Sequence, residues 1–431
     1  MNTVLLNTVN LDDGRIIKKG GSGGGGVTIK NQTKSVTIAE NGNTVVSYDS
    51  GYTGLEKVSV KVAIPNEEKT VEITENGTTE VVADSGFLSK VIVNANVASG
   101  GGGSSDIPVI GDGKTYLYIK IAEKGRMNVP LYFSQTVANG VTIDWGDGSA
   151  TQTLSGTGNV NTTHTYADTG EYVISLNPAD GCTLELGSTS SSYCVMGSTD
   201  YIGRVYCNML QAVELGKNIT RIRYNTFNNC PSLASVVIPE GVTSIGDKAF
   251  NNCYSLASVV IPEGVTSIGS SAFYSCYSLA SVVILKGVTS IGSSAFDNCF
   301  SLASVVIPEG VTSIDGYTFN NCPSLASVVI PEGVTSIGDY AFYYCYSLAS
   351  VVIPEGVTSI GNKAFNGCYG MAFYDFRAAK SVPTLSNANA FTSIPSECKI
   401  VVPDSLYDTW IAATNWSTYA SKMVKASEFN G

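Results

Sequence analysis

The sequence predicts a mainly β protein of several domains, whose longest domain is a solenoid of stacked 23-residue coils. The phrase C-x-S-L-A-S-V-V-I-P-E-G-V-T-S-I-G-x-x-A-F-x-x recurs almost unchanged between Cys230 and about Gly367. Two residue types keep the same step: cysteines at Cys230, Cys253, Cys276, Cys299, Cys322, Cys345 and Cys368, and phenylalanines at Phe227, Phe250, Phe273, Phe296, Phe319, Phe342 and Phe365. A constant period of this length is typical of a solenoid, because one coil cannot bury its apolar face without its neighbours.

Residue types assign each segment of a coil. In the coil that begins at Cys253, the β-branched run Leu256–Ile261 suits a strand, and Pro262–Gly264 suits a turn. Val265–Ile268 is a second short strand, and Ala272–Cys276 is a short helical or irregular turn. We expect the apolar side chains of the coil to point inward and stack on their copies: Leu256, Val259, Ile261, Val265, Ile268, Phe273 and Cys276.

The recurring pattern L-x-x-V-x-I-P-x-x-V-x-x-I-G-x-x-A-F-x-x-C resembles the BspA-type leucine-rich repeat over about residues 207–400. The resemblance implies a solenoid over 201–403 that binds other molecules and catalyses nothing. The phrase V-P-D-S-L-Y-D-T-W-I-A-A-T-N-W is similar to the ends of such proteins from gut Bacteroidales, which implies a helical C-terminal cap over 404–431. Asp404 and Asn415 are the predicted helix caps, and the aromatic residues of this segment should plug the solenoid end.

The first hundred residues read as small β-modules between glycine tracts. Residues 1–26 are a leader ending in a Gly-rich linker, 27–66 and 67–98 are two related modules, and 99–105 is a Gly/Ser linker. Asn41-Gly42 and Asn76-Gly77 predict hairpin turns within the modules. The modules are similar to small β-modules repeated in tail-fibre and other appendage proteins of gut phages.

Residues 106–200 are predicted to form an independent β-sandwich. The elements T-I-D-W-G-D-G-S at 142–149, H-T-Y at 164–166 and G-E-Y-V-I-S-L at 170–176 resemble a PKD-type domain. That resemblance implies a spacer, in some members a carbohydrate-binding one.

The cysteines are expected to be free. Seven lie in register on one ladder, where parallel Cβ directions fit disulfide geometry poorly, so they should form a row of small buried side chains. A bridge between Cys182 and Cys194 stays open. No C-x-x-C spacing occurs, which argues against a zinc site.

Little in the sequence suggests catalysis, a metal or a cofactor. The net charge of −11 argues against nucleic acid and against anionic membrane surfaces, and no apolar run reaches the ~20 residues that span a bilayer. His164 is the only histidine, and the H-T-Y motif explains it structurally. Asp144 and Asp147 are read as turn residues, with Ca²⁺ binding as the alternative. Glutamates recur in the turn of successive coils, at Glu240, Glu263, Glu309, Glu332 and Glu355. We interpret this row as a solvated edge, with a Ca²⁺-binding strip of carboxylates as the minor alternative.

Variation between coils concentrates around A-F-x-x-C, where Tyr, Asn, Ser, Asp and Gly predominate. Tyrosine gives a large amphipathic contact at low entropic cost, so we expect a receptor-binding face here, against the alternative of neutral variation on a solvated turn. Its candidate residues are Tyr254, Tyr274, Tyr277, Phe300, Tyr317, Tyr340, Tyr343, Tyr344, Tyr346 and Tyr369.

The function predicted from these features is a non-enzymatic virion appendage, tail-fibre or adhesin-like, that binds a host surface glycan or protein through its solenoid. The N-terminal residues lack the basic start and apolar core of a secretory signal, which favours a virion protein whose leader contacts other virion proteins. The alternative is a bacterial cell-surface BspA-like adhesin. Such appendages are often trimers, but no coiled-coil heptads occur, so the oligomeric state stays open.

Overall fold

A computed structural model describes seven strands within residues 2–97, and then residues 112–187, 193–198 and 204–429. The chain forms two compact units, divided between Ile110 and Gly111. The glycine-rich linkers predicted at 20–26 and 99–105 lie outside the described residues.

The described strands of the first unit form two sheets, with orders β3-β1-β7-β6 and β2-β4-β5. Their bounds are β1 (Asn2–Leu11), β2 (Asn31–Ile38), β3 (Thr44–Val46), β4 (Gly54–Ile64), β5 (Glu67–Ile73), β6 (Gly77–Val82) and β7 (Ser89–Val97). Because β2 pairs with β4, β3 with β1, and β6 with β7, neither Asn-Gly dipeptide joins two paired strands, and the hairpin prediction is wrong. The consecutive strands that pair antiparallel are β4 with β5, where Ile64 lies opposite Glu67, and β6 with β7. A turn dipeptide expresses a local preference, which longer-range strand pairing overrides.

The second unit begins with two facing sheets built from short alternating strands. Their elements are β8 (Thr115–Ile121), η1 (Lys124–Arg126), β9 (Asn128–Gln135), β10 (Val141–Asp144), β11 (Gln152–Thr153), β12 (Gly158–Thr165), β13 (Gly170–Pro178) and β14 (Leu184–Leu186). The smaller sheet has the order β12-β9-β14, and the larger contains β11-β10-β13-β8. Alternate side chains of β8 and β9, such as Leu117 and Leu131, are buried in one core with Trp145.

The sandwich and the solenoid share a sheet, which the sequence did not predict. The first solenoid strand, β17 (Leu210–Glu214), pairs antiparallel with β8 on one side and parallel with β18 on the other. Glu185 of β14 also pairs with Arg221 and Arg223 of the first coil. The sandwich therefore covers the open end of the solenoid core, helped by β15 (Tyr193–Cys194), β16 (Gly197–Ser198) and α1 (Arg204–Cys207).

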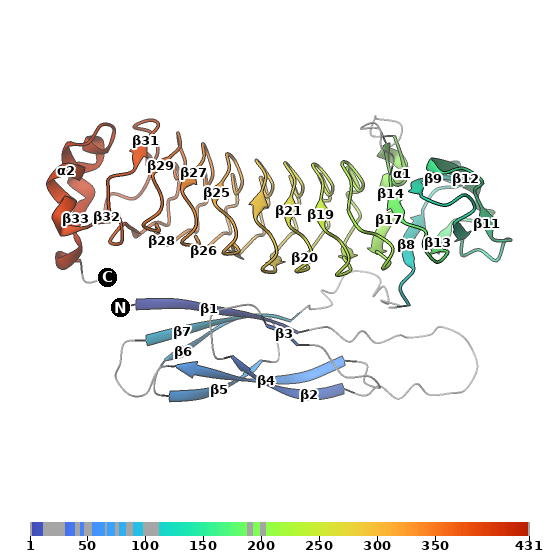
Figure 1. The fold of residues 1–431 in the computed structure, drawn as a ribbon, viewed down its shortest axis with the longest axis horizontal. Coiled ribbons are helices and arrows are strands. Elements are labelled where there is room, and N and C mark those ends of the chain that lie inside the picture. The colour runs from blue at the N-terminus through green and yellow to red at the C-terminus, as the bar shows by residue number, and fades with distance from the viewer. Residues whose placement is uncertain are drawn as a thin grey trace. The chain divides into compact units, whose positions relative to one another are not determined.

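Each coil contributes two short strands to two parallel rows, as the repeat predicts (Figure 1). The first row contains β18 (Ser235–Val237), β20 (Ser258–Ile261), β22 (Ser281–Ile284), β24 (Ser304–Val306), β26 (Ser327–Val329), β28 (Ser350–Val352), β30 (Phe373–Asp375) and β32 (Lys399–Val402). The second contains β19 (Ser244–Ile245), β21 (Ser267–Ile268), β23 (Ser290–Ile291), β25 (Ser313–Ile314), β27 (Ser336–Ile337), β29 (Ser359–Ile360) and β31 (Thr384–Leu385). Register follows the period, with Ser258 opposite Ser281 and Ser336 opposite Ser359.

The core of the solenoid is a stack of phenylalanine rings beside a column of cysteines. Phe273 lies 5.1 Å from Phe250 and 5.3 Å from Phe296, measured between ring centroids. Each ladder thiol from Cys253 onward donates to a phenylalanine carbonyl of the preceding coil, as Cys276 does to Phe250 at 3.2 Å. All these cysteines are buried and free, as predicted, and burial raises the pKa of Cys276. Cys182 and Cys194 are free as well, so the bridge left open does not form.

The C-terminal segment closes the other end of the solenoid, as the sequence predicts. Its elements are η2 (Asp404–Leu406), α2 (Tyr407–Ala412), η3 (Trp416–Lys422), β33 (Met423–Lys425) and η4 (Ala426–Glu428). Trp410 and Trp416 are buried against Phe376.

Asn415 is the N-cap residue of η3, as predicted, whereas Asp404 is the first residue of η2 and its N-cap is Pro403. Neither side chain makes a cap hydrogen bond. Asp404 accepts a hydrogen bond from the backbone N–H of Ser427, and Asn415 donates its amide to Leu385. Both side chains therefore tie their helices to other segments.

One coil interrupts the second row of strands: within the described residues, β23 and β25 are neighbours without ladder hydrogen bonds. In regular coils the residue after this strand is glycine, and a Cβ there would meet the preceding coil's backbone, at 2.6 Å for Gly292 and 2.4 Å for Gly361. Asp315 occupies that position and carries a Cβ. It therefore holds its coil away from the coil before it.

Asp315→Gly should close this interruption. Two further backbone hydrogen bonds, each contributing about 1 kcal/mol, are offset in part by the greater freedom of glycine in the unfolded chain. We expect the free energy of unfolding to rise by about 1 kcal/mol in urea titration, with Asp339→Gly as the control. An unchanged or lower stability of the Asp315→Gly variant would contradict this explanation.

A buried carboxyl lies in the A-F turn of the same region. Asp297 is 6% exposed and accepts a hydrogen bond from the Asn320 amide at 2.7 Å. Burial raises its pKa from 3.8 to about 6. The folded chain therefore binds this proton more tightly than the unfolded chain, so this group's contribution to stability falls as pH rises from about 4 to about 6.

Asp297→Asn should remove that loss of stability, because an amide does not ionise. Other coils already carry asparagine at this position, as Asn251, Asn320 and Asn366. We expect the variant to exceed the native chain in stability by on the order of 1 kcal/mol at about pH 7.5, and by nothing at about pH 4. Urea denaturation at both pH values measures the difference. A difference that does not change with pH would refute the assignment.

Candidate functional site

The A-F-x-x-C segment of each coil turns through two left-handed residues. Seven residues with φ between 54° and 61° immediately precede the A-F pair or its equivalent: Asn225, Lys248, Ser271, Ser294, Tyr317, Tyr340 and Lys363. A second column immediately precedes the cysteine, at Asn229, Asn252, Ser275, Asn298, Asn321, Tyr344 and Gly367. Asparagine and glycine tolerate this conformation, whereas a bulky side chain there is unusual and costs on the order of 1–2 kcal/mol.

Nine of the ten predicted aromatic residues fall into two groups of ring contacts. The tyrosine ladder consists of Tyr254, Tyr277 and Phe300, whose rings stack nearly parallel at 4.8 and 4.7 Å. Tyr277 thus has a neighbouring ring over each face and exposes its edge and hydroxyl. The position that would continue this stack holds Pro323, which ends the ladder.

The tyrosine cluster lies in the following coils and consists of Tyr317, Tyr340, Tyr343, Tyr344, Tyr346 and Tyr369. Its rings form a continuous chain of contacts with centroid distances of 4.0–5.4 Å. Most contacts are tilted, including 65° between Tyr340 and Tyr343 and 45° between Tyr344 and Tyr346. Tyr346 and Tyr369 are 40% and 55% exposed. The cluster therefore presents rings in several orientations to solvent.

Two residues that the sequence did not place in the site complete the cluster. Lys363 holds its ammonium 5.4 Å from the Tyr340 ring centroid and 5.8 Å from that of Tyr343. A Cβ on Gly367 would meet the Tyr344 ring at 2.3 Å, so this glycine lets the ring lie close to the next coil. Lys363 and Gly367 stand one period after Tyr340 and Tyr344, and that spacing could have identified both.

Tyr274 belongs to neither group. It is half-buried, and within the described part of the chain its ring makes none of the stacked or tilted contacts that define the ladder and the cluster.

The pKa values of three tyrosine hydroxyls in the cluster, Tyr317, Tyr343 and Tyr346, lie above the ordinary value. A side-chain hydrogen bond with Tyr344 raises the pKa of Tyr343 to about 12. Partial burial raises the pKa of Tyr317 and Tyr346. These hydroxyls can both donate and accept hydrogen bonds, and Lys363 adds one positive charge beside them.

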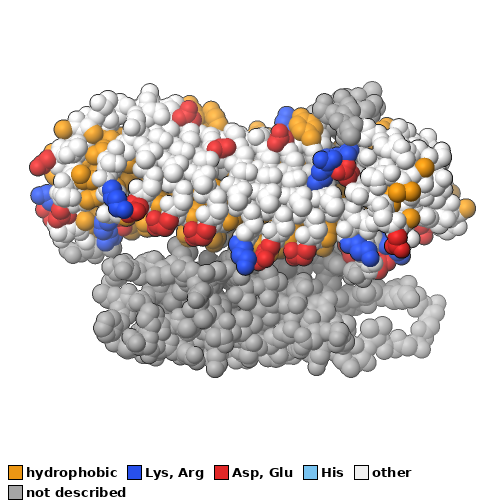
Figure 2. All heavy atoms as spheres, viewed as in Figure 1, with side chains coloured by type: hydrophobic (Ala, Val, Ile, Leu, Met, Phe, Trp, Pro, Cys, Tyr) orange, Lys and Arg blue, Asp and Glu red, His pale blue; other side chains and the backbone are white. Residues whose placement is uncertain are grey.

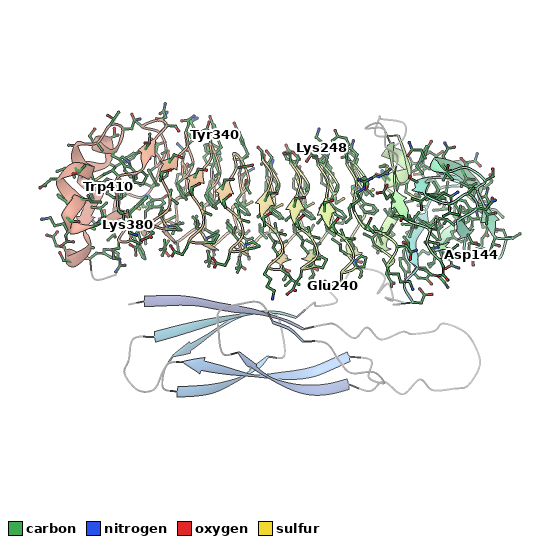
Figure 3. The ribbon with its side chains drawn as sticks, in the orientation of Figure 1. Asp144, Glu240, Lys248, Tyr340, Lys380 and Trp410 are labelled. Carbon is green, nitrogen blue, oxygen red and sulfur yellow. The ribbon has the colours of Figure 1, made fainter. Side chains whose placement is uncertain are left out.

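The glutamate ladder occupies the opposite edge of the coils. Figure 3 places Tyr340 and Lys248 on one edge and Glu240 on the other, and Figure 2 shows acidic side chains in a row along the latter. The row is solvent-exposed, and two of its members meet lysines: Glu263 with Lys286 at 3.6 Å and Glu355 with Lys380 at 2.8 Å. The aromatic and acidic features are therefore separate surfaces.

The acidic turn of the sandwich is engaged in its own hydrogen bonds. Asp144 and Asp147 accept the backbone N–H groups of Gly146 and Ser149, each at 3.0 Å. His164 contacts Asp147 at 2.7 Å and stacks on Trp145 at 4.7 Å. The bond to Ser149, with the His164 contact, lowers the pKa of Asp147 to about 2.

No cluster of three or more His, Cys, Asp or Glu that could hold a metal ion occurs among the described residues. No helix among them is long and apolar enough to cross a membrane.

Gly367→Asn tests the packing of Tyr344. Asparagine tolerates the left-handed conformation, but its Cβ would clash with the Tyr344 ring, so we expect a loss of about 1–3 kcal/mol in the free energy of unfolding. Adding Tyr344→Asn should recover most of that loss, because paired asparagines already bond in this column, as Asn298 and Asn321 do at 2.6 Å. A double-mutant cycle in urea measures the coupling. Additive effects would show that the two residues do not touch as described.

Comparison with known proteins gives a match over the repeats. The family model described as the BspA type leucine rich repeat region matches in six copies, at residues 205–326, 243–373 and 314–409. A search of curated proteins found no match.

Several solved structures are similar to this chain. A leucine-rich repeat protein of T. pallidum is 32% identical, with 44% of this chain and 83% of that one covered and a TM-score of 0.37. A leucine-rich cell surface protein of Faecalibacterium prausnitzii is 23% identical (48% and 83% covered, TM-score 0.22). A leucine-rich repeat protein of Eubacterium ventriosum is also 23% identical (53% and 75% covered, TM-score 0.29). On the family match, the repeat region of this chain, residues 205–409, belongs to the BspA-type leucine-rich repeat family.

Proposed function

We propose that this protein is a non-enzymatic, adhesin-like surface protein that binds its partner through the tyrosine cluster. The observation that carries the proposal is the presence of Tyr317, Tyr340 and Tyr344 in left-handed backbone positions of adjacent coils. Strained residues of this kind persist where the surrounding structure holds them, and they concentrate at functional sites.

The fold does not require these tyrosines. At the same two columns, other coils carry Lys248, Ser294 and Asn298 with the same backbone and the same inward stack. Neutral variation on a solvated turn would favour residues that relax the backbone, whereas the cluster gathers bulky residues that strain it. The tyrosines supply what a recognition surface needs, which is rigid amphipathic area.

The core beneath the cluster supports rigid presentation. Phe319, Phe342 and Phe365 stack directly below at 5.5 and 5.2 Å. Because these rings and the ladder hydrogen bonds hold the coils in register, little entropy remains to be lost when a partner binds.

Replacing the cluster by the residues of neighbouring coils tests the proposal. The variant Tyr340→Ser, Tyr343→Asn, Tyr344→Asn should fold with unchanged or slightly higher stability and lose at least tenfold in binding to target cells. Flow cytometry with labelled full-length chain measures binding. The matched control, Tyr254→Ser with Tyr277→Ser, removes ladder rings and should bind normally.

Unchanged binding by the cluster variant would refute the proposed site. If charge reversal along Glu263, Glu309, Glu332 and Glu355 removed binding instead, the opposite edge would be the functional surface.

Family membership favours a cell surface as the place of action. The alternative is a virion appendage. Its leader would contact other virion proteins and its solenoid would bind a host receptor, with a trimer as one expected assembly. Antibody to the full chain, applied to purified phage particles and to intact bacteria, separates the two. Labelling of bacteria alone supports the cell-surface adhesin, and labelling of particles supports the appendage.

A further inference from the structure

The geometry and surroundings of the tyrosine cluster point to the class of its ligand, and this inference rests on the function proposed above. In the tyrosine ladder, ring faces cover one another, so mainly edges meet solvent. In the cluster, the rings of Tyr340, Tyr343, Tyr344 and Tyr346 are tilted relative to one another, so they do not cover all of one another's faces. An open aromatic face carries partial negative charge, which attracts the partly positive C–H groups of a ligand.

The exposed surroundings of the cluster are polar and small. In the turns 315–323, 339–347 and 362–370, the aliphatic and phenylalanine side chains are buried, and the side chains that reach solvent are Tyr, Asn, Asp, Ser, Pro and Lys. A typical protein partner would place apolar anchors in dry pockets, which these turns do not offer. The cluster instead alternates aromatic faces with hydrogen-bonding groups.

Several of those groups are available to a ligand. The hydroxyls of the cluster can donate and accept, and the ammonium of Lys363 has no carboxylate partner among the described residues. The backbone of Asn362 pairs with Tyr340 at 2.9 Å. The side-chain oxygen of Asn362 is buried and has no hydrogen-bond partner within the described region. This acceptor belongs to the residue that precedes Lys363 in the chain.

We propose that the tyrosine cluster binds a carbohydrate chain. Sugar rings combine C–H faces, which pack on Tyr343, Tyr344 and Tyr346, with hydroxyls that both donate and accept. The tyrosine hydroxyls, the Asn362 amide and the Lys363 ammonium supply the matching hydrogen bonds. The array continues along the coils from Tyr317 to Tyr369, so it suits several linked sugar units rather than a single one.

An array of defined neutral and acidic oligosaccharides, probed with the full chain, tests this proposal. We expect binding of at least one oligosaccharide, followed by calorimetry of that compound with the native chain and its variants. Tyr343→Asn with Tyr344→Asn should weaken binding at least tenfold. Tyr254→Ser with Tyr277→Ser should leave it within twofold.

Conservative variants separate the contributions within the site. Tyr344→Phe keeps the ring and should weaken binding less than Tyr344→Asn does. Lys363→Gln should weaken the binding of an acidic oligosaccharide more than the binding of a neutral one. Equal effects on both would assign Lys363 a hydrogen-bonding role within the same site.

Treatment of target cells distinguishes failure of this inference from failure of the proposed function. Periodate, which cleaves sugar diols, should remove cell binding. If binding survives periodate, disappears after protease and still depends on the cluster, the ligand is a protein: the carbohydrate inference is overturned and the adhesin-like function stands. If the cluster variants bind cells like the native chain, both are overturned.

Discussion

Backbone hydrogen bonding between coils is the interaction on which the rest of this structure depends. No coil has a core of its own, and each gains one only when its strands pair with identical strands one period away. That pairing places Phe on Phe and Cys under the preceding phenylalanine carbonyl. It also restricts the glycine that follows most strands of the second row, because a Cβ there would meet the backbone of the preceding coil. The interruption at Asp315 shows how local this restriction is, because one side chain opens one row of the ladder while the phenylalanine stack continues between Phe296 and Phe319.

The same constraint separates the residues that build the stack from those that we propose bind a partner. Inward positions repeat almost unchanged because any larger or smaller side chain would disturb two neighbouring coils at once. The A-F turn carries side chains that point away from the stack, so its residues can differ between coils at little cost to packing. The cost that remains is conformational, and it falls on the left-handed positions. Tyr340 and Tyr344 meet that cost where Asn would largely avoid it, and Gly367 accommodates the Tyr344 ring.

Both ends of the solenoid are closed by a change of structure rather than by a polar last coil. At the start, β8 of the sandwich pairs with β17, so the solenoid core continues into the sandwich core. At the C-terminal end, β33 adds a last strand, and Trp410 and Trp416 pack on Phe376 and Phe391, which are fully buried. A solenoid closed in this way exposes few unpaired strand edges, which limits edge-to-edge association.

The sequence by itself determined the repeat, its strands, its inward residues and its free cysteines, because a 23-residue period places identical side chains one above another and leaves little choice of packing. It also identified the variable tyrosines, since variation within a repeat can be read without a structure. Only the tertiary structure decided which tyrosine rings contact one another. Ring tilt depends on the backbone angles of left-handed residues and on the neighbour one coil away, and neither can be read from Tyr277 or Tyr344 alone. The shared sheet between β8 and β17 and the true partners of Asp404 and Asn415 were likewise beyond the sequence, because they join segments that carry no common pattern.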